Sequence, residues 1–345
     1  MDRTIAAWLA PEQASLLRHA AHAAELRVVA AGSPARGQTG GVAEQLGGAP
    51  IGDLRTMLAT TDAGLILIAA PESFGAGPDP ADAGAIRAAH ARGVKIATLE
   101  PIPAAALDLA SGGWTESGLG PRPVDVIRFC PLARLSAPFR AAAEVLAGFG
   151  HIRMMQVESW SVPAEGSLGA RLYGAMELVL SLLGEPELID AAYVARGHGK
   201  GVHSLPGESL RGLDGDLTAN LRFADGRAAG LAVSNQAGRW NRTTTLVGPA
   251  GRLRIFDDGF EWIAPDGAKT DELRSPARKR GAEPAVPLSA AALADALARL
   301  LDPAIPDPGP TDHATVLAMG QAALLSARTG QAESPATIKH MAGAV

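Results

Sequence analysis

The chain has 345 residues, of which 47% are hydrophobic and 19% charged, with a formal net charge of −5 and a pI of about 5.9. The apolar content excludes a disordered chain, and the acidic balance gives no reason to expect a nucleic-acid partner. The single cysteine, Cys130, excludes an internal disulfide, and its apolar surroundings predict a buried, inert thiol. The sequence contains no run of 18 apolar residues, so we expect no membrane span. The N-terminus lacks a signal-peptide pattern, and we therefore expect a cytoplasmic protein.

The first 34 residues have the pattern of a strand, a tight turn, a helix and a second strand. Residues 4–9 form a short apolar run that suits a buried parallel strand. Pro11 suits the first turn of a helix, because the N–H that it lacks would have no helical partner there. Residues 26–31 predict the second strand. A dinucleotide-binding domain begins in this order.

Strands and helices go on alternating as far as residue 147. Helices are predicted over 42–46, 51–59, 80–92 and 138–147, and strands over 64–70, 94–99 and 124–129. This alternation favours a parallel, doubly wound sheet.

The pattern changes at about His151. A strand over 152–160 and a helix over 170–183 precede further strands at about 189–195, 217–223, 228–234, 243–248, 252–256 and 260–263. Glycines and Asp-Gly pairs separate these strands, which is typical of antiparallel turns. Two helices, over 289–301 and 311–328, close the chain.

Six segments, taken together, are similar to those of a known family. They are DAGLILIAAP (62–71), ADAGAIRAAHARGVKIATLEP (81–101), RFCP (128–131), FADGRAAGLAVS (223–234), LVGPAGRLRIFDDG (246–259) and AALLSARTGQ (322–331). In this order and spacing they resemble the Gfo/Idh/MocA oxidoreductases, the family of glucose–fructose oxidoreductase and inositol dehydrogenase. The resemblance covers nearly the whole chain.

The resemblance, joined to the element pattern, implies the fold class and the domains. We expect an α/β Rossmann-type N-terminal domain and an α+β C-terminal domain with a large, mostly antiparallel open sheet. The predicted boundaries are 1–125 for the dinucleotide-binding-like domain, 126–310 for the substrate and oligomerisation domain, and 311–345 for the C-terminal helix and tail.

The family's catalytic motifs are altered. The fourth strand of the family leads to Glu-Lys-Pro, but here residues 99–101 read Leu-Glu-Pro, so Glu100 stands in place of the lysine. The family's Asp-x-x-x-His helix start, aligned on the Leu-Leu-Gly-Glu that follows it, falls on Ala170 and Gly174. Only its last acid is retained, as Glu177. The lysine and the histidine are therefore both missing.

Catalysis on an alcohol would need another proton carrier, because hydride transfer to or from a nicotinamide moves a proton at the alcohol oxygen. The candidates are Glu100 as a base and Tyr173 as a phenol donor, with Glu177 on the same helical face as Tyr173. Structural alternatives stand beside them. Glu100 also suits a hydrogen-bonded acid at a strand end, and Tyr173 suits core packing.

The cofactor loop is altered as well. Where G-x-G-x-x-G would bind a pyrophosphate, residues 9–14 read Leu-Ala-Pro-Glu-Gln-Ala, and a Cβ at those positions blocks close approach. The acid expected after the second strand is replaced by Ser33 and Arg36, which suit a 2′-phosphate. NAD or NADP is therefore possible without an intact motif. By resemblance, the candidate cofactor contacts are Ala10, Pro11, Gln13, Ser33, Arg36, Ala70, Pro71 and Pro101.

No metal site is predicted. His198 and His203 lie five residues apart in a glycine-rich loop, and no third ligand of suitable spacing accompanies them.

Two functions remain open. One is a family member with degenerate motifs that acts as a binding or scaffold subunit; the other is an active NAD(P)-dependent oxidoreductase on a sugar, polyol or related alcohol with an altered proton relay. Possible partners are a small-molecule ligand, a second copy joined through the C-terminal sheet, or a family member with intact motifs. Neither nucleic acid nor a membrane is expected.

Overall fold

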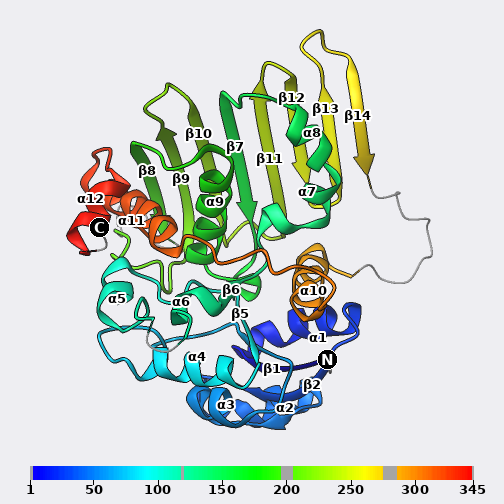
Figure 1. Cartoon of the computed structure of the whole chain (residues 1–345), viewed down its shortest axis with the longest axis vertical. Helices are drawn as coiled ribbons and strands as arrows, with labels where there is room; N and C mark the ends of the chain where they lie inside the picture. Colours follow the sequence, from blue (N-terminus) through cyan, green and yellow to red (C-terminus); the bar gives the residue numbers. More distant parts are fainter. Residues whose placement is uncertain (1–2, 118–119, 196–204, 275–285, 344–345) are drawn as a thin grey trace.

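The computed structural model describes residues 3–117, 120–195, 205–274 and 286–343. Two sheets stand one above the other, the N-terminal one below and the larger one above (Figure 1). No helix within the described ranges is long and apolar enough to cross a membrane.

The N-terminal sheet has six parallel strands in the order β3-β2-β1-β4-β5-β6. Their bounds are β1 Thr4–Trp8, β2 Arg27–Gly32, β3 Ala49–Pro50, β4 Leu65–Ile68, β5 Lys95–Thr98 and β6 Ile127–Phe129. The four residues of β4 are all buried and apolar, because helices cover both faces of a doubly wound sheet. The predicted Rossmann-type domain is confirmed.

Helices of the first half of the chain flank this sheet. They are α1 (Ala14–Ala23), α2 (Thr39–Leu46), α3 (Leu54–Thr60), α4 (Ala81–Ala91), α5 (Ala106–Ser111) and α6 (Pro123–Val126). The predicted strand over 124–129 is wrong in its first half, because residues 124–126 belong to the short helix α6, which begins at Pro123. Only the last three residues form a strand, β6.

The large sheet has eight strands in the order β14-β13-β12-β11-β7-β10-β9-β8. They are β7 (Met154–Trp160), β8 (Leu188–Ala195), β9 (Gly215–Arg222), β10 (Ala228–Ser234), β11 (Asn241–Gly248), β12 (Gly251–Phe256), β13 (Gly259–Ile263) and β14 (Lys269–Arg274). Only the pairing of β7 with β10 is parallel. A mostly antiparallel sheet is therefore confirmed.

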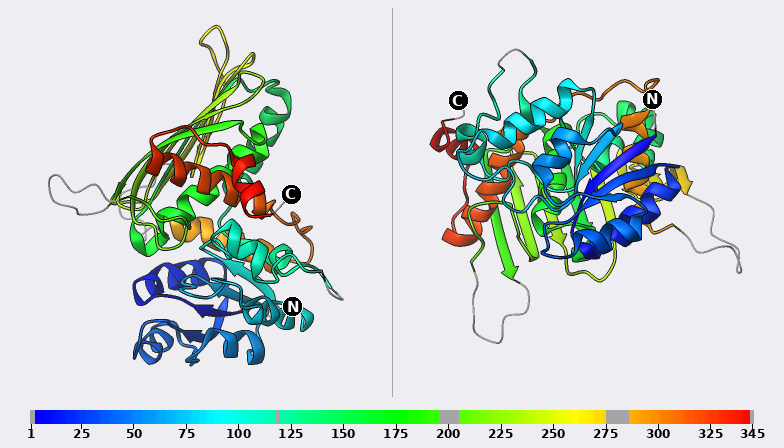
Figure 2. Two further views of the ribbon diagram at one scale, coloured as in Figure 1. Left: turned by 90° about the vertical axis from the view of Figure 1, so that its left-hand side faces the viewer. Right: turned by 90° about the horizontal axis from the view of Figure 1, so that it is seen from below.

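One face of this sheet is covered by helices (Figure 2). The helices of the second half of the chain are α7 (Ala137–Ala141), α8 (Ala143–Gly148), α9 (Leu168–Leu183), α10 (Leu288–Leu301), α11 (His313–Thr329) and α12 (Pro335–Met341). Among them, α9, α11 and α7 pack on the sheet. Burial alternates along β7, and Met154 and Trp160 are among the residues on the open face.

The helix α10 follows the strands of the large sheet in the chain, but it lies beside α1 on the N-terminal sheet (Figure 1). Leu293 and Leu297 share one buried apolar cluster with Ile5 of β1 and Leu17 of α1. The boundaries 1–125 and 126–310 stay a prediction, but this helix of the second segment completes the core of the first. It also forms one wall of a cavity described below.

Candidate functional site

The turn after β1 is closed by one of its own side chains. Its 3-10 helix η1 (Pro11–Gln13) carries the carboxamide of Gln13, which accepts a hydrogen bond from the Ala10 N–H at 2.9 Å and donates to the Ala69 carbonyl at 3.3 Å. The Gln13 side chain lies where this turn meets the end of β4, and the residue is 6% exposed. Pro11 has no N–H to offer. The Ala10 amide is thus already bonded and Pro11 has none, so neither position offers an N–H to a pyrophosphate.

A second turn covers the first. The 3-10 helix η3 (Pro163–Glu165) of the C-terminal half packs against η1. Within η3, the carboxylate of Glu165 accepts a hydrogen bond from the Val162 N–H at 3.1 Å, which fixes the turn. The two turns therefore lie against each other beyond the end of β1.

Ser33 and Arg36 follow β2 as predicted, but they differ in exposure. The Ser33 hydroxyl is buried and accepts a hydrogen bond from the Ala35 N–H at 3.3 Å. Arg36 is exposed, and no described residue forms an ion pair or hydrogen bond with it. After β4, the Ala70 N–H bonds weakly to the Trp8 carbonyl at 3.4 Å, and the Pro71 carbonyl accepts from Phe74.

Glu100 follows β5 and holds the N-terminus of α9. Its carboxylate accepts hydrogen bonds from the N–H of Ser167 at 2.8 Å and from the Ser167 hydroxyl at 2.5 Å. The same hydroxyl caps α9 by accepting from the Ala170 N–H at 3.0 Å. Burial raises the pKa of Glu100, while the bonds from Ser167 and the charges of Arg171 and Arg211 oppose that rise.

Tyr173 belongs to a short hydrogen-bonded chain that ends in backbone. Its hydroxyl lies 2.7 Å from Nδ1 of His313, and Nε2 of His313 lies 2.8 Å from the Pro103 carbonyl oxygen. Because that oxygen can only accept, Nε2 carries the proton and Nδ1 accepts from Tyr173. Burial lowers the pKa of His313 to about 4 and raises the pKa of Tyr173 well above its usual value. Both groups are neutral at pH 7.

Glu177, one turn along α9 from Tyr173, forms an ion pair of its own. Its Oε1 accepts a hydrogen bond from Nε of Arg134 at 2.5 Å, and Glu177 is only 3% exposed. Arg134 belongs to the 3-10 helix η2 (Ala133–Leu135). Burial raises the pKa of Glu177, and Arg134 opposes that rise. Tyr173 and Glu177 share a helical face as predicted, but each bonds to a partner from a different segment.

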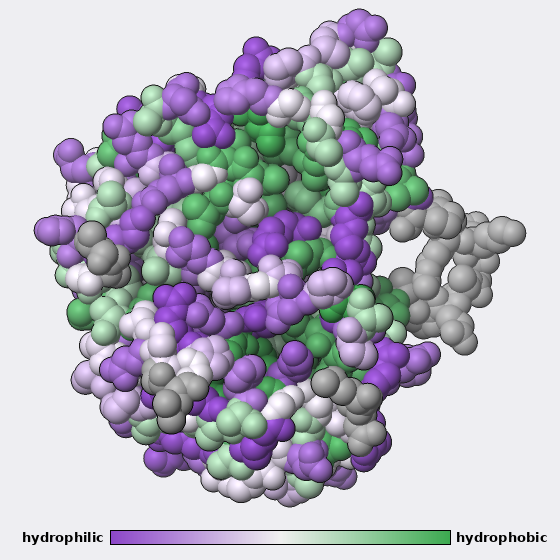
Figure 3. Space-filling model, in the orientation of Figure 1, coloured by the Kyte–Doolittle hydropathy of each residue, from purple (hydrophilic) through white to green (hydrophobic). Residues whose placement is uncertain are grey.

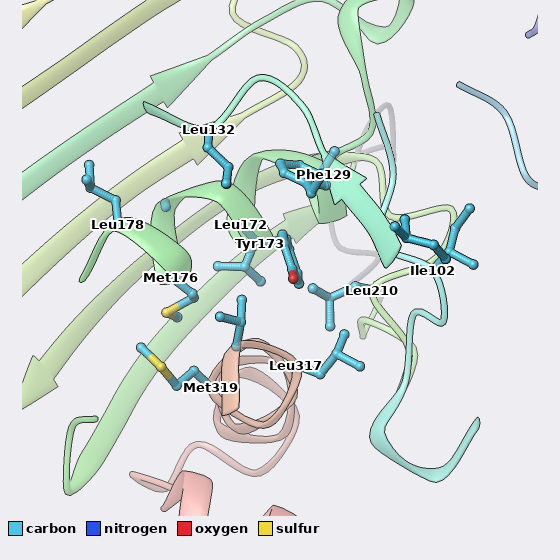
Figure 4. Close-up of a cluster of buried hydrophobic side chains, with 14 of the residues drawn as sticks. Ile102, Phe129, Leu132, Leu172, Tyr173, Met176, Leu178, Leu210, Leu317 and Met319 are labelled. Carbon is cyan, nitrogen blue, oxygen red and sulfur yellow. The ribbon is translucent and has the colours of Figure 1, made fainter. Parts of the chain in front are cut away.

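The space beside Gly174 is filled by Phe129 of β6. The Phe129 ring lies 4.7 Å from the Tyr173 ring, and its edge is 3.5 Å from where a Cβ of Gly174 would be (Figure 4). The cavity left beside Gly174 measures about 20 Å³, and another of about 10 Å³ lies between Pro101, Tyr173 and His313. Such volumes hold a water molecule and no sugar.

The architecture is shared with solved structures. A myo-inositol dehydrogenase from Corynebacterium glutamicum superposes with a TM-score of 0.62 and 17% identity, covering 96% of this chain and 98% of that one. An oxidoreductase from Agrobacterium radiobacter, solved with NAD⁺, L-tartaric acid and magnesium, gives 0.65 and 15%, covering 97% and 99%. Levoglucosan dehydrogenase in complex with NADH and L-sorbose gives 0.66 and 14%, with the same coverage.

This chain has the Gfo/Idh/MocA fold. No protein-family model matches its sequence, and no curated protein matches it. At identities of 14 to 17% the likeness concerns the fold, so the chemistry has to be argued from this chain's own residues.

Four residues outside the predicted site residues complete the contacts at this site. They are Arg134, Ser167, Arg171 and His313. Arg171 is only 4% exposed, and its guanidinium lies 4.5 Å from the Trp240 ring centroid. Burial and the charge of Arg242 lower its pKa to about 10.

No group of three or more histidine, cysteine or acidic residues that could hold a metal occurs in the described parts of the chain. His198 and His203 lie outside the described residues. Cys130 is buried, and burial raises its thiol pKa to about 12, which fits the inert thiol predicted from the sequence.

Proposed function

We propose that this protein is a non-catalytic member of the fold, a binding or scaffold subunit without the standard NAD(P)-dependent sugar or polyol chemistry. The observation that carries the proposal is the closed turn after β1. Its Ala10 amide is bonded to Gln13, Pro11 supplies no N–H, and η3 packs on top. The residues present at the cofactor position therefore do not fit a dinucleotide.

The candidate proton carriers support the same proposal. Glu100 is bonded to Ser167 and the helix end, and Glu177 is bonded to Arg134. The Tyr173–His313 chain ends at the Pro103 carbonyl, which takes up no proton at physiological pH. Each of the three groups thus has an internal partner that explains its presence without catalysis.

The alternative is an active NAD(P)-dependent oxidoreductase with an altered proton relay, and Arg36 is the observation that favours it. This exposed cation stands after β2 beside Ser33, where an acid would bind the ribose hydroxyls of NAD and a cation would bind the 2′-phosphate of NADP. NADPH is therefore the cofactor to test first.

Titration with NADPH and NADH separates the two functions. We expect no binding of either nucleotide at millimolar concentration, measured by calorimetry and nicotinamide fluorescence, because the turn after β1 is closed. Levoglucosan dehydrogenase, solved with NADH, serves as the positive control. Micromolar affinity for NADPH that is lost in Arg36→Ala would overturn the proposal and establish the alternative.

A scaffold role requires a partner surface, and we propose that the open face of the large sheet supplies it to a second copy of this chain. Met154 lies on that face in β7 and is 49% exposed. We expect light scattering to report a dimer, and Met154→Glu to weaken its association at least tenfold. Leu107→Glu, which changes an exposed leucine on α5, is the matched control and should leave the dimer intact. If the wild-type protein instead purifies as a monomer or with a second family member, the homodimer proposal fails.

A further inference from the structure

A cavity of about 390 Å³ lies away from the site described above. Its walls come from the edge of the N-terminal sheet at β5 and β6, from α10, and from the link 302–311. That link crosses the front of the molecule from α10 to α11 (Figure 1), on a side where polar side chains gather across the middle of the surface (Figure 3). The volume falls within the range of small-molecule sites.

The cavity has mostly apolar walls. Aliphatic side chains line it from every segment around it, and Ile96, Leu132, Leu135, Leu300 and Ile305 are among them. Phe129 lines this cavity and also both small cavities beside Tyr173. The strand β6 thus lies between the small cavities near Gly174 and Tyr173 and the large cavity beside α10. Aliphatic walls suit the hydrocarbon part of a ligand.

Two ion pairs neutralise charged groups that line the cavity, whereas Asp302, which also lines it, keeps its charge. Arg128 forms a two-pronged ion pair with Asp307, at 2.8 and 3.1 Å. Asp295 pairs with Arg140 at 2.9 and 3.0 Å. Asp302 is exposed and accepts a hydrogen bond from the Ala304 N–H.

Two cations are left over. Lys95 and Arg299 both line the cavity, and no described residue forms a hydrogen bond or a close ion pair with either. Lys95 acts on Asp307 only at longer range, where its charge helps to lower the pKa of that acid. With the two ion pairs set aside, Lys95 and Arg299 outweigh Asp302 by one positive charge. An apolar cavity with a surplus of positive charge attracts an anion with a hydrocarbon body.

We propose that this cavity binds a medium-chain aliphatic carboxylate, with its headgroup at Lys95 and Arg299 and its chain along the aliphatic walls. The site is independent of the proposed function, because its two cations touch neither the closed turn nor Glu100, and Phe129, which lines the cavity, packs on Tyr173 only through its ring. It would stand even if NADPH were found to bind.

Calorimetry with octanoate on the full-length protein tests the proposal. We expect one molecule of octanoate to bind per chain, and octan-1-ol, which lacks the charge, to bind at least tenfold more weakly. The double variant Lys95→Gln with Arg299→Gln should weaken octanoate binding at least tenfold. Arg18→Gln, which removes an exposed cation of α1 outside the cavity, is the matched control and should bind as the wild type does.

A space-filling variant adds a second line of evidence. Ala296 of α10 lines the cavity, and Ala296→Trp should abolish octanoate binding. Circular dichroism and the unfolding midpoint of Ala296→Trp report whether this variant folds. If it does not fold, the double charge variant decides whether octanoate binds in the cavity. Absence of octanoate binding at millimolar concentration, equal binding of octan-1-ol, or unchanged binding in the charge variants would overturn the proposal. Whether the wild type binds NADPH tests the proposed function and does not decide whether this cavity binds octanoate.

Discussion

Replacing Arg134 by methionine is expected to lower the free energy of unfolding by about 3–5 kcal/mol, the cost of leaving one partner of a buried ion pair without the other. Glu177 is almost fully buried, and its Oε2 already lacks a hydrogen-bond partner among the described residues. Without Arg134, the remaining carboxylate oxygen loses its partner too. Urea unfolding at pH 7 measures the effect.

Two comparisons identify the cause of that loss. Adding Glu177→Leu to Arg134→Met removes the stranded charge and should recover most of the stability, because an apolar pair of similar size is often as stable as a buried ion pair. Lys269→Met breaks an exposed pair with Glu272 on β14 and should hardly move the unfolding midpoint. Equal destabilisation by Lys269→Met would show that the burial of Glu177 is not the source.

The loss should also depend on pH. In Arg134→Met the pKa of Glu177 should rise further above its unfolded value, since burial then acts without an opposing cation. A group whose folded pKa is raised binds its proton more tightly in the folded state. Stability is therefore present at low pH and lost as the pH rises through the folded pKa. The deficit of the variant should shrink when unfolding is measured at pH 5 instead of pH 7.

Much of the fold could be predicted because its signals are local. The apolar run of β4 is long enough for one buried strand, and the glycine-punctuated strands after residue 205 predicted an open antiparallel sheet. The strand β14 was missed because its six residues are all exposed and largely charged, so no apolar alternation marks it. Helix α6 was missed because a single turn of four residues carries almost no periodicity.

The contacts at the candidate site could be predicted only in part. The altered positions, Glu100 and Gly174, are visible in the sequence once it is compared with the family motifs. Their consequences are not, because they depend on residues far away along the chain. His313 lies 140 residues from Tyr173, and Ser167 lies 67 residues from Glu100. Even a contact within one turn was not predictable, because the sequence of residues 9–14 does not indicate that the Gln13 carboxamide accepts a hydrogen bond from the Ala10 N–H.

The cavity beside α10 was beyond prediction for a related reason. Its walls combine the edge of the N-terminal sheet with a helix and a link about 200 residues further along the chain. The sequence predicted the helix over 289–301, but its apolar face could pack on either sheet. The structure shows that Leu293 and Leu297 pack in the core of the N-terminal sheet.

We also expect folding to be sensitive to acid, because His313 is half-buried and its pKa is lowered in the folded protein. Its pKa is about 4 in the folded protein and 6.5 when unperturbed, so the unfolded chain binds the proton at a higher pH. Stability is then complete above pH 6.5 and is lost as the pH falls toward 4. For a shift of this size in a partly exposed residue, we expect about 2 to 3 kcal/mol between pH 7 and pH 4.

His313→Gln isolates this contribution, because glutamine keeps a donor for Pro103 and an acceptor for Tyr173 but does not titrate. The free energy of unfolding of the wild type should fall by that amount more than that of the variant over the same pH range. His151→Gln, which replaces an exposed histidine, should follow the wild type. Parallel curves for the wild type and His313→Gln would mean that His313 protonates equally easily in both states. A solvent-open histidine bonded to Tyr173 is what an altered proton relay requires, so that result would favour the oxidoreductase over the scaffold.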